Sequence, residues 1–118
     1  MKRQNQKGFT LIEILISLFV LCVVLLAIST MVFSVMRATS QSKEMAAATT
    51  LVQDKMENLR NTRVGLLAAG NDSVNLGNII YLRQWDIAAN GNIRTVNVTV
   101  NWNSRGTHNV SMTTLRGD

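Results

Sequence analysis

The chain has 118 residues, a formal net charge of +5 and a pI near 10.2. This length allows one domain, and a single Cys excludes an intramolecular disulfide framework; with a single His, it also disfavours a Cys/His zinc cluster. The high pI favours anionic partners, namely nucleic acid or a membrane surface. The charge is unevenly distributed, however, because three basic groups and no acid lie in residues 1–8: Lys2, Arg3 and Lys7.

A long apolar run follows this basic start. From Phe9 to Met36, 22 of 28 residues are apolar and Glu13 is the only charged one. About 20 apolar residues suffice to cross a bilayer as a helix, and the preceding basic residues predict a cytoplasmic N-terminus. A secretory signal cleaved near Ala27 is the alternative, but its apolar region would be shorter than this one. We therefore expect a single membrane span that leaves most of the chain outside the cytoplasm.

Glu13 is unusual within this run. A carboxylate at the bilayer centre costs about 2–3 kcal/mol, and less near the interface. The simple interpretation is that Glu13 reaches the headgroups. The functional interpretation is that it meets a positive charge, and the sequence holds no basic residue between Lys7 and Arg37. That charge would come from a second subunit, or from a new amino terminus produced by cleavage nearby.

The segment Lys7-Gly8-Phe9-Thr10-Leu11-Ile12-Glu13 with the apolar run resembles the class III prepilin signal of the type IV pilin superfamily. The resemblance implies that prepilin peptidase cleaves between Gly8 and Phe9 on the cytoplasmic side and N-methylates Phe9. It also implies that Glu13 pairs with the Phe9 ammonium of a neighbouring subunit. The expected organisation is a leader at 1–8, a transmembrane and assembly half-helix at 9–36, and an extracytoplasmic pilin-like domain at 37–118.

A continuous helix is expected to extend beyond the apolar run. The sequence has neither Gly nor Pro between Phe9 and Val64, so we expect Gly65 to end the helix. An apolar stripe at helical spacing predicts a face packed on a core: Met45, Ala48, Val52, Met56 and Leu59.

Beyond the helix, the spacing of the apolar residues changes from the helical period to every second residue, which is typical of strands. Residues 65–78 are expected to form a loop with room for one short strand. Alternation in 96–102 predicts a half-buried strand, Asn90-Gly91-Asn92 and residues 104–107 predict turns, and 79–87 and 109–115 predict two further strands. The inward face of 79–87 is ambiguous. The expected fold is α+β and pilin-like: one long N-terminal helix whose outer half packs on an antiparallel sheet of about three strands.

The second half adds a finer resemblance. Residues 45–60 and 94–115 are similar to minor pilins of the V type (pilus modification) and to pseudopilin I of type II secretion. The chain departs from classical major pilins in two respects, since it has no C-terminal Cys pair and no Pro in the apolar helix.

No catalytic, metal or cofactor site can be assembled from the residues. Cys22 lies in the apolar run, His108 is expected at the surface near a turn, and the pair Asp54 and Glu57 resembles many solvated pairs. Four arginines interleave with aromatic residues, a pattern that a nucleic-acid stacking platform would also show: Arg83, Arg94, Arg105 and Arg116 with Tyr81, Trp85 and Trp102. We favour core tryptophans with a solvated arginine rim, so nucleic acid is not the expected partner.

The sequence therefore predicts a non-enzymatic minor pilin or pseudopilin, compatible with an initiation or tip role in a type IV pilus or a similar filament. The resemblance implies three kinds of partner: prepilin peptidase, other pilins or pseudopilins, and an inner-membrane assembly platform. The subunit is expected first in the inner membrane and then in a cell-surface or periplasmic filament. Two alternatives stay open, a bitopic membrane-anchored binding module and a competence pseudopilin that contacts DNA.

Overall fold

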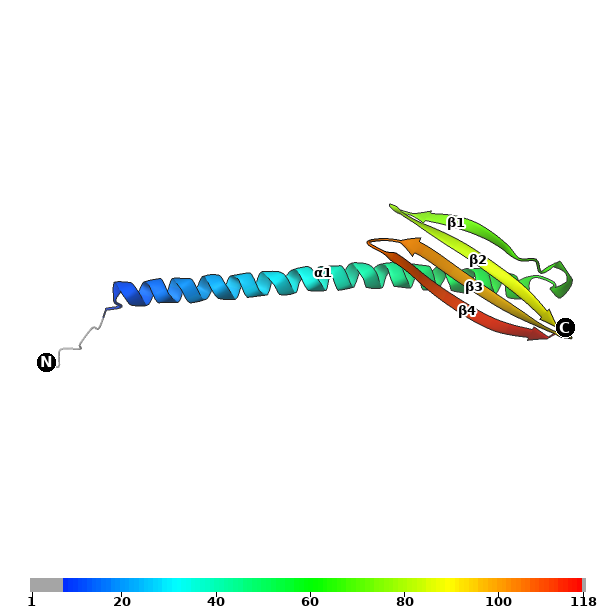
Figure 1. Ribbon diagram of the computed structural model, residues 1–118, viewed down its shortest axis with the longest axis horizontal. Coiled ribbons are helices and arrows are strands. Elements are labelled where there is room, and N and C mark those ends of the chain that lie inside the picture. The colour runs from blue at the N-terminus through cyan, green and yellow to red at the C-terminus, as the bar shows by residue number, and fades with distance from the viewer. Residues whose placement is uncertain (1–7, 118) are drawn as a thin grey trace. The chain divides into compact units, whose positions relative to one another are not determined.

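The computed structural model describes residues 8–117. Its elements follow in the order α1 (Leu11–Asn61), η1 (Val64–Leu66), β1 (Gly70–Leu76), β2 (Ile79–Asn90), β3 (Ile93–Asn103) and β4 (Thr107–Gly117) (Figure 1). The chain divides into two compact units between Ser40 and Gln41, and α1 contributes to both. The predicted helix followed by an antiparallel sheet is thus confirmed as an α+β, pilin-like arrangement.

The helix ends earlier than predicted. We expected Gly65 to stop it, but α1 ends at Asn61 and Gly65 lies within η1. The reason is a contact from the far end of the chain: Arg116 Nη1 donates to the carbonyl oxygens of Leu59 (2.9 Å) and Thr62 (2.7 Å). Leu59 O also accepts from the backbone N–H of Thr62 (3.3 Å), so a tight turn and a distant arginine together take the place of the expected glycine cap.

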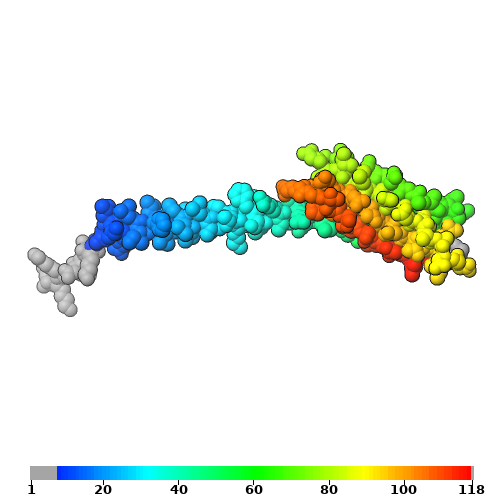
Figure 2. Space-filling model, viewed as in Figure 1, coloured from blue at the N-terminus to red at the C-terminus, as the bar shows by residue number. Residues whose placement is uncertain are grey.

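The sheet has four antiparallel strands in the order β1-β2-β3-β4, one more than the expected three. The additional strand, β1, comes from the segment that we expected to be mainly a loop. Gly77, at φ 66°, makes the tight turn into β2, a backbone conformation that glycine adopts without strain. β1 is rich in Asn, Asp and Ser, so its composition resembles a loop although its backbone pairs with β2 along its whole length. In Figure 2 the atoms of the strands lie side by side as one continuous layer of the second unit.

The core lies between α1 and the inner face of this sheet. Ala48, Val52, Met56 and Leu59 are buried as the stripe predicts, whereas Met45 is 42 % exposed. The alternation of β3 is also confirmed, because its buried side chains recur at every second position: Val96, Val98, Val100 and Trp102. β2 adds Tyr81, which settles the ambiguous face of that strand: Tyr81, Arg83 and Trp85 face inward. Each fully buried aliphatic side chain contributes about 1.5–3 kcal/mol.

Candidate assembly site at the start of the long helix

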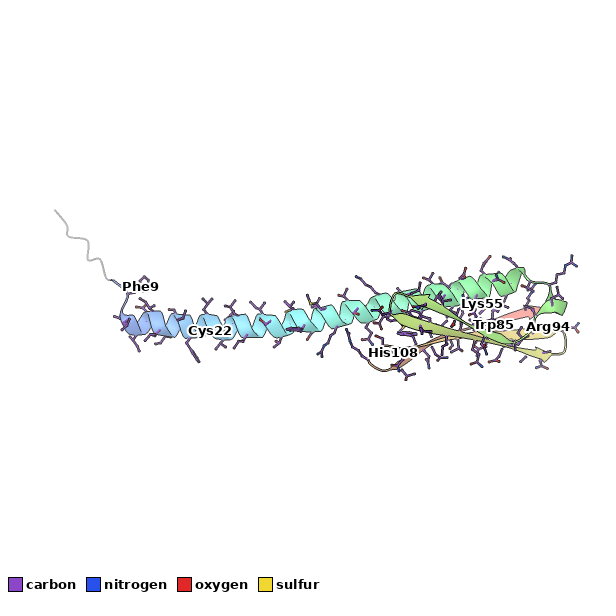
Figure 3. All side chains as sticks on the ribbon, turned by 90° about the horizontal axis from the view of Figure 1, so that it is seen from above. Phe9, Cys22, Lys55, Trp85, Arg94 and His108 are labelled. Carbon is purple, nitrogen blue, oxygen red and sulfur yellow. The ribbon has the colours of Figure 1, made fainter. Side chains whose placement is uncertain are left out.

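The predicted cleavage position lies just before α1. Gly8 and Phe9 are exposed and precede the first helical residue, Leu11, and Phe9 is 80 % exposed. A Cβ placed on Gly8 would meet no atom within 4 Å. The packing of the described residues therefore leaves room for a side chain at this position. Figure 3 shows Phe9 ahead of the helix.

Thr10 caps the helix, a role that the sequence analysis did not assign. The Glu13 backbone N–H points at Thr10 Oγ1 (3.4 Å), and Thr10 O accepts from the backbone N–H groups of Glu13 (3.1 Å) and Ile14 (3.2 Å). Thr10 and Glu13 have the spacing of a capping box, the signal that could have revealed this role. A carboxylate in the first turn also suits the helix dipole. Within residues 8–117 the Glu13 carboxylate makes no hydrogen bond back to Thr10, so the cap rests on Thr10 and the backbone, and Glu13 contributes through the helix dipole.

The Glu13 side chain is exposed, and it forms no ion pair within residues 8–117. The charge that would neutralise it must therefore come from outside the described part of the chain. Lys2, Arg3 and Lys7, the basic residues of the predicted leader, lie outside the described residues.

The first unit presents apolar side chains all around α1. From Phe9 to Met36 its large hydrophobic residues are between 46 % and 80 % exposed, and the most apolar window of α1 has a mean hydropathy of 3.1. This length and composition suffice to cross a membrane. Hydroxyl groups here are satisfied within the helix, since Ser17, Ser29 and Ser34 each donate to the carbonyl four residues back. The surface is thus suited to an apolar environment, either lipid or other helices.

Other candidate residues do not form a chemical site. Cys22 is a free, exposed thiol on the apolar surface, and no group of three potential metal ligands occurs among the described residues. His108 differs from the expectation of a surface residue: it is half-buried, its ring stacks on Trp102 with centroids 5.5 Å apart, and its Nε2 lies 3.2 Å from Ser104 O. It packs at one end of the sheet, opposite the end where Arg94 lies (Figure 3).

The aromatic residues of the second unit do not form an exposed stacking platform. Tyr81 and Trp102 are 2 % and 3 % exposed, and burial raises the pKa of the Tyr81 phenol, with Glu44 adding to the effect. Arg83 is engaged by carboxylates and Arg116 by the end of α1. The interpretation as core aromatics fits this geometry, whereas a platform for bases would need exposed rings.

A comparison with protein-family models matches residues 3–29 to the prokaryotic N-terminal methylation motif. No curated protein and no solved structure matches the chain. The matched segment contains the Gly8–Phe9 bond, the Thr10 cap, Glu13 and the first part of the apolar helix. Motif and helix together support a type IV pilin-like protein that prepilin peptidase processes.

Proposed function

We propose that this chain is a minor pilin or pseudopilin, cut between Gly8 and Phe9, N-methylated at Phe9 and assembled into a type IV pilus or a pilus-like filament. Its task is structural, and no step of it needs a catalytic residue in this chain. Its partners are prepilin peptidase, other pilins or pseudopilins and an inner-membrane assembly platform. The resemblance of residues 45–60 and 94–115 favours the minor pilin V or pseudopilin I subgroup.

One observation carries the proposal. The methylation motif covers a peptide bond that is exposed just before a helix whose apolar surface is uncovered. An exposed bond suits proteolysis, and an uncovered apolar helix needs lipid before assembly and other helices after it. The motif and the surface thus account for the two states of one subunit, an inner-membrane precursor and a filament component.

Glu13 would give the assembly its register. Cleavage after Gly8 creates an ammonium group on Phe9, and Glu13 lies four residues further along, about one helical turn away. In a bundle of apolar helices, a carboxylate left without a partner would be costly. A neighbouring subunit shifted by about one turn brings its own Phe9 ammonium to Glu13 and removes that cost. The leader charges Lys2, Arg3 and Lys7 would keep the N-terminus cytoplasmic, with the domain at 37–118 on the other side.

The test is co-expression with a prepilin peptidase and measurement of the intact mass. We expect loss of residues 1–8 and gain of one methyl group on Phe9. Gly8→Val should block cleavage because a side chain now enters the peptidase site. Gly65→Val is the matched control, since a Cβ at either glycine meets nothing within 4 Å. It should be processed like the unmodified chain.

An uncut chain in the presence of active peptidase would refute the proposal and favour the bitopic membrane-anchored binding module. A competence pseudopilin that contacts DNA is the other alternative. It would show salt-dependent binding of duplex DNA by the processed chain in detergent.

A further inference from the structure

β1 adds little to the hydrophobic core of the second unit. The buried core residues come from α1, β2 and β3, and the partly buried apolar residues packed on them include none from β1. Leu76, at one end of β1, is 46 % exposed, and only Val74 is a half-buried aliphatic residue. β1 is therefore attached mainly by its backbone pairing to β2 and by polar contacts.

The strongest of these contacts is an ion pair across the two strands. Asp72 lies opposite Arg83, whose Nε donates to Oδ1 (2.7 Å) and whose Nη2 donates to Oδ2 (2.6 Å). α1 joins through Lys55, whose Nζ is 3.9 Å from Asp72 Oδ2, and Asp54, whose Oδ2 is 3.6 Å from Arg83 Nη1. The hydrogen bonds from Arg83 hold the pKa of the Asp72 carboxyl below its ordinary value of 3.8, against the opposing effect of burial. A bidentate pair of this kind is geometrically specific.

Trp85 forms the second attachment. Its Nε1 donates to Ala68 O (3.0 Å), and Lys55 Nζ lies 3.6 Å from its ring centroid. Gly70, paired with Trp85 across the strands, leaves the space that the ring occupies: a Cβ on Gly70 would lie 2.7 Å from a ring carbon. Figure 3 shows Lys55 and Trp85 together between helix and sheet.

We propose that residues 68–76, here called the strap, detach from β2 and dock again as one unit while β2, β3 and β4 stay packed on the α1 residues 41–61. Leu67 stays behind as an anchor, because it packs against the core, and Gly77 in the turn is the second hinge. Segments with few buried apolar contacts open at lower free energy than the global fold. Opening uncovers Trp85 and the backbone edge of β2 from Ile79 to Trp85, a surface able to pair with another strand.

Hydrogen exchange of the full chain in a non-ionic detergent tests this device. In Asp72→Asn the carboxylate–guanidinium pair is lost, so we expect exchange in residues 70–76 to rise at least about tenfold. Exchange in residues 93–103, the central strand β3, should change by less than about twofold. Asp86→Asn is the matched control: Asp86 is exposed on the same sheet, and no ion pair of the described residues includes it.

A second pair of variants keeps the test decisive if Asp72→Asn does not fold. Arg83→Lys retains the charge but loses the bidentate geometry, so it should accelerate exchange in 70–76 less than Asp72→Asn would. Ser73 and Leu82 are cross-strand neighbours, so Ser73→Cys/Leu82→Cys in a Cys22→Ser background can form a disulfide between β1 and β2. Exchange in 70–76 should be slow when this disulfide is oxidised and should return to the faster rate when it is reduced.

Two results would overturn the proposal. Equal acceleration in 70–76 and 93–103 would show that β1 unfolds only with the whole sheet. Unchanged exchange in 70–76 in both Asp72→Asn and Arg83→Lys would show that the ion pair does not hold the strap. Neither result would bear on processing at Gly8–Phe9, so the strap and the proposed function fail separately.

Discussion

Arg116 caps the end of α1 from the last strand of the sheet, and its replacement by Met isolates this contact. A hydrogen bond from a charged donor contributes about 1.5–3 kcal/mol, and a cation at a helix C-terminus favours the dipole. Arg116 Nη1 reaches two terminal carbonyl oxygens, of Leu59 at 2.9 Å and Thr62 at 2.7 Å. Against this, Arg94 lies directly opposite on β3, and a like-charge pair costs about 0.2–1 kcal/mol. The net loss expected for Arg116→Met is about 2 kcal/mol.

The assay is urea unfolding of the full chain in a non-ionic detergent, followed by tryptophan fluorescence. Trp102 is 3 % exposed, so its emission reports loss of the core between α1 and the sheet. With an m-value of about 1–2 kcal/mol/M, typical of a small domain, the midpoint should fall by roughly 1 M. The midpoint of Arg116→Lys should lie between those of the unmodified chain and Arg116→Met, because the Lys ammonium keeps the charge but cannot reproduce the planar donor geometry of the guanidinium.

Arg94→Met is the matched control for the same loss of charge. Arg94 lies on the neighbouring strand and, within residues 8–117, donates no hydrogen bond to the helix, so its removal should leave the urea midpoint unchanged or raise it slightly. If the urea midpoint fell equally in Arg94→Met and Arg116→Met, the loss of stability would come from the lost charge rather than from the lost hydrogen bonds to the carbonyls of α1. No decrease in Arg116→Met would refute the capping argument itself.

Three further predictions address assembly and the strap. Glu13→Ala should be cleaved and stay in the membrane but be depleted from sheared filaments. The control Thr10→Ala loses about 1 kcal/mol of helix capping and should be incorporated within about twofold of normal. Equal depletion of both variants would assign the effect to the start of the helix rather than to charge pairing by Glu13. Gly70→Ala should displace Trp85 and cost about 1–3 kcal/mol, with red-shifted emission that Gly65→Ala does not show. Because the folded pKa of Asp72 is lowered, its stabilisation is present above the ordinary value of 3.8 and is lost as the pH falls through the lower folded value. Below about pH 4 the protection of the amides in 70–76, taken relative to the intrinsic exchange rate at each pH, should therefore fall, and Asp72→Asn should abolish that acid dependence.

The sequence predicted the parts of the fold that rest on strong local patterns. The stripe of α1 and the alternation of β3 were recognisable because apolar residues recur there with the period of the element that buries them. β1 was mostly missed because its inward positions hold Gly70, Asp72 and Val74, which give no apolar period. Met45 was assigned to the core since it continues the stripe, but it remains 42 % exposed.

The prediction for the N-terminal segment rests on the sequence alone, because its signals are local. Basic residues at 2, 3 and 7, Gly8-Phe9, Glu13 and the start of a long apolar run lie close together in the chain, and the N-terminal methylation motif matches this region at residues 3–29. The contacts that only the tertiary structure decided join residues far apart in the chain: Arg116 with the end of α1, Asp72 with Arg83 and Lys55, and Trp85 with Ala68. Charged and aromatic side chains can satisfy many partners, so their partners depend on which strands the sheet places side by side.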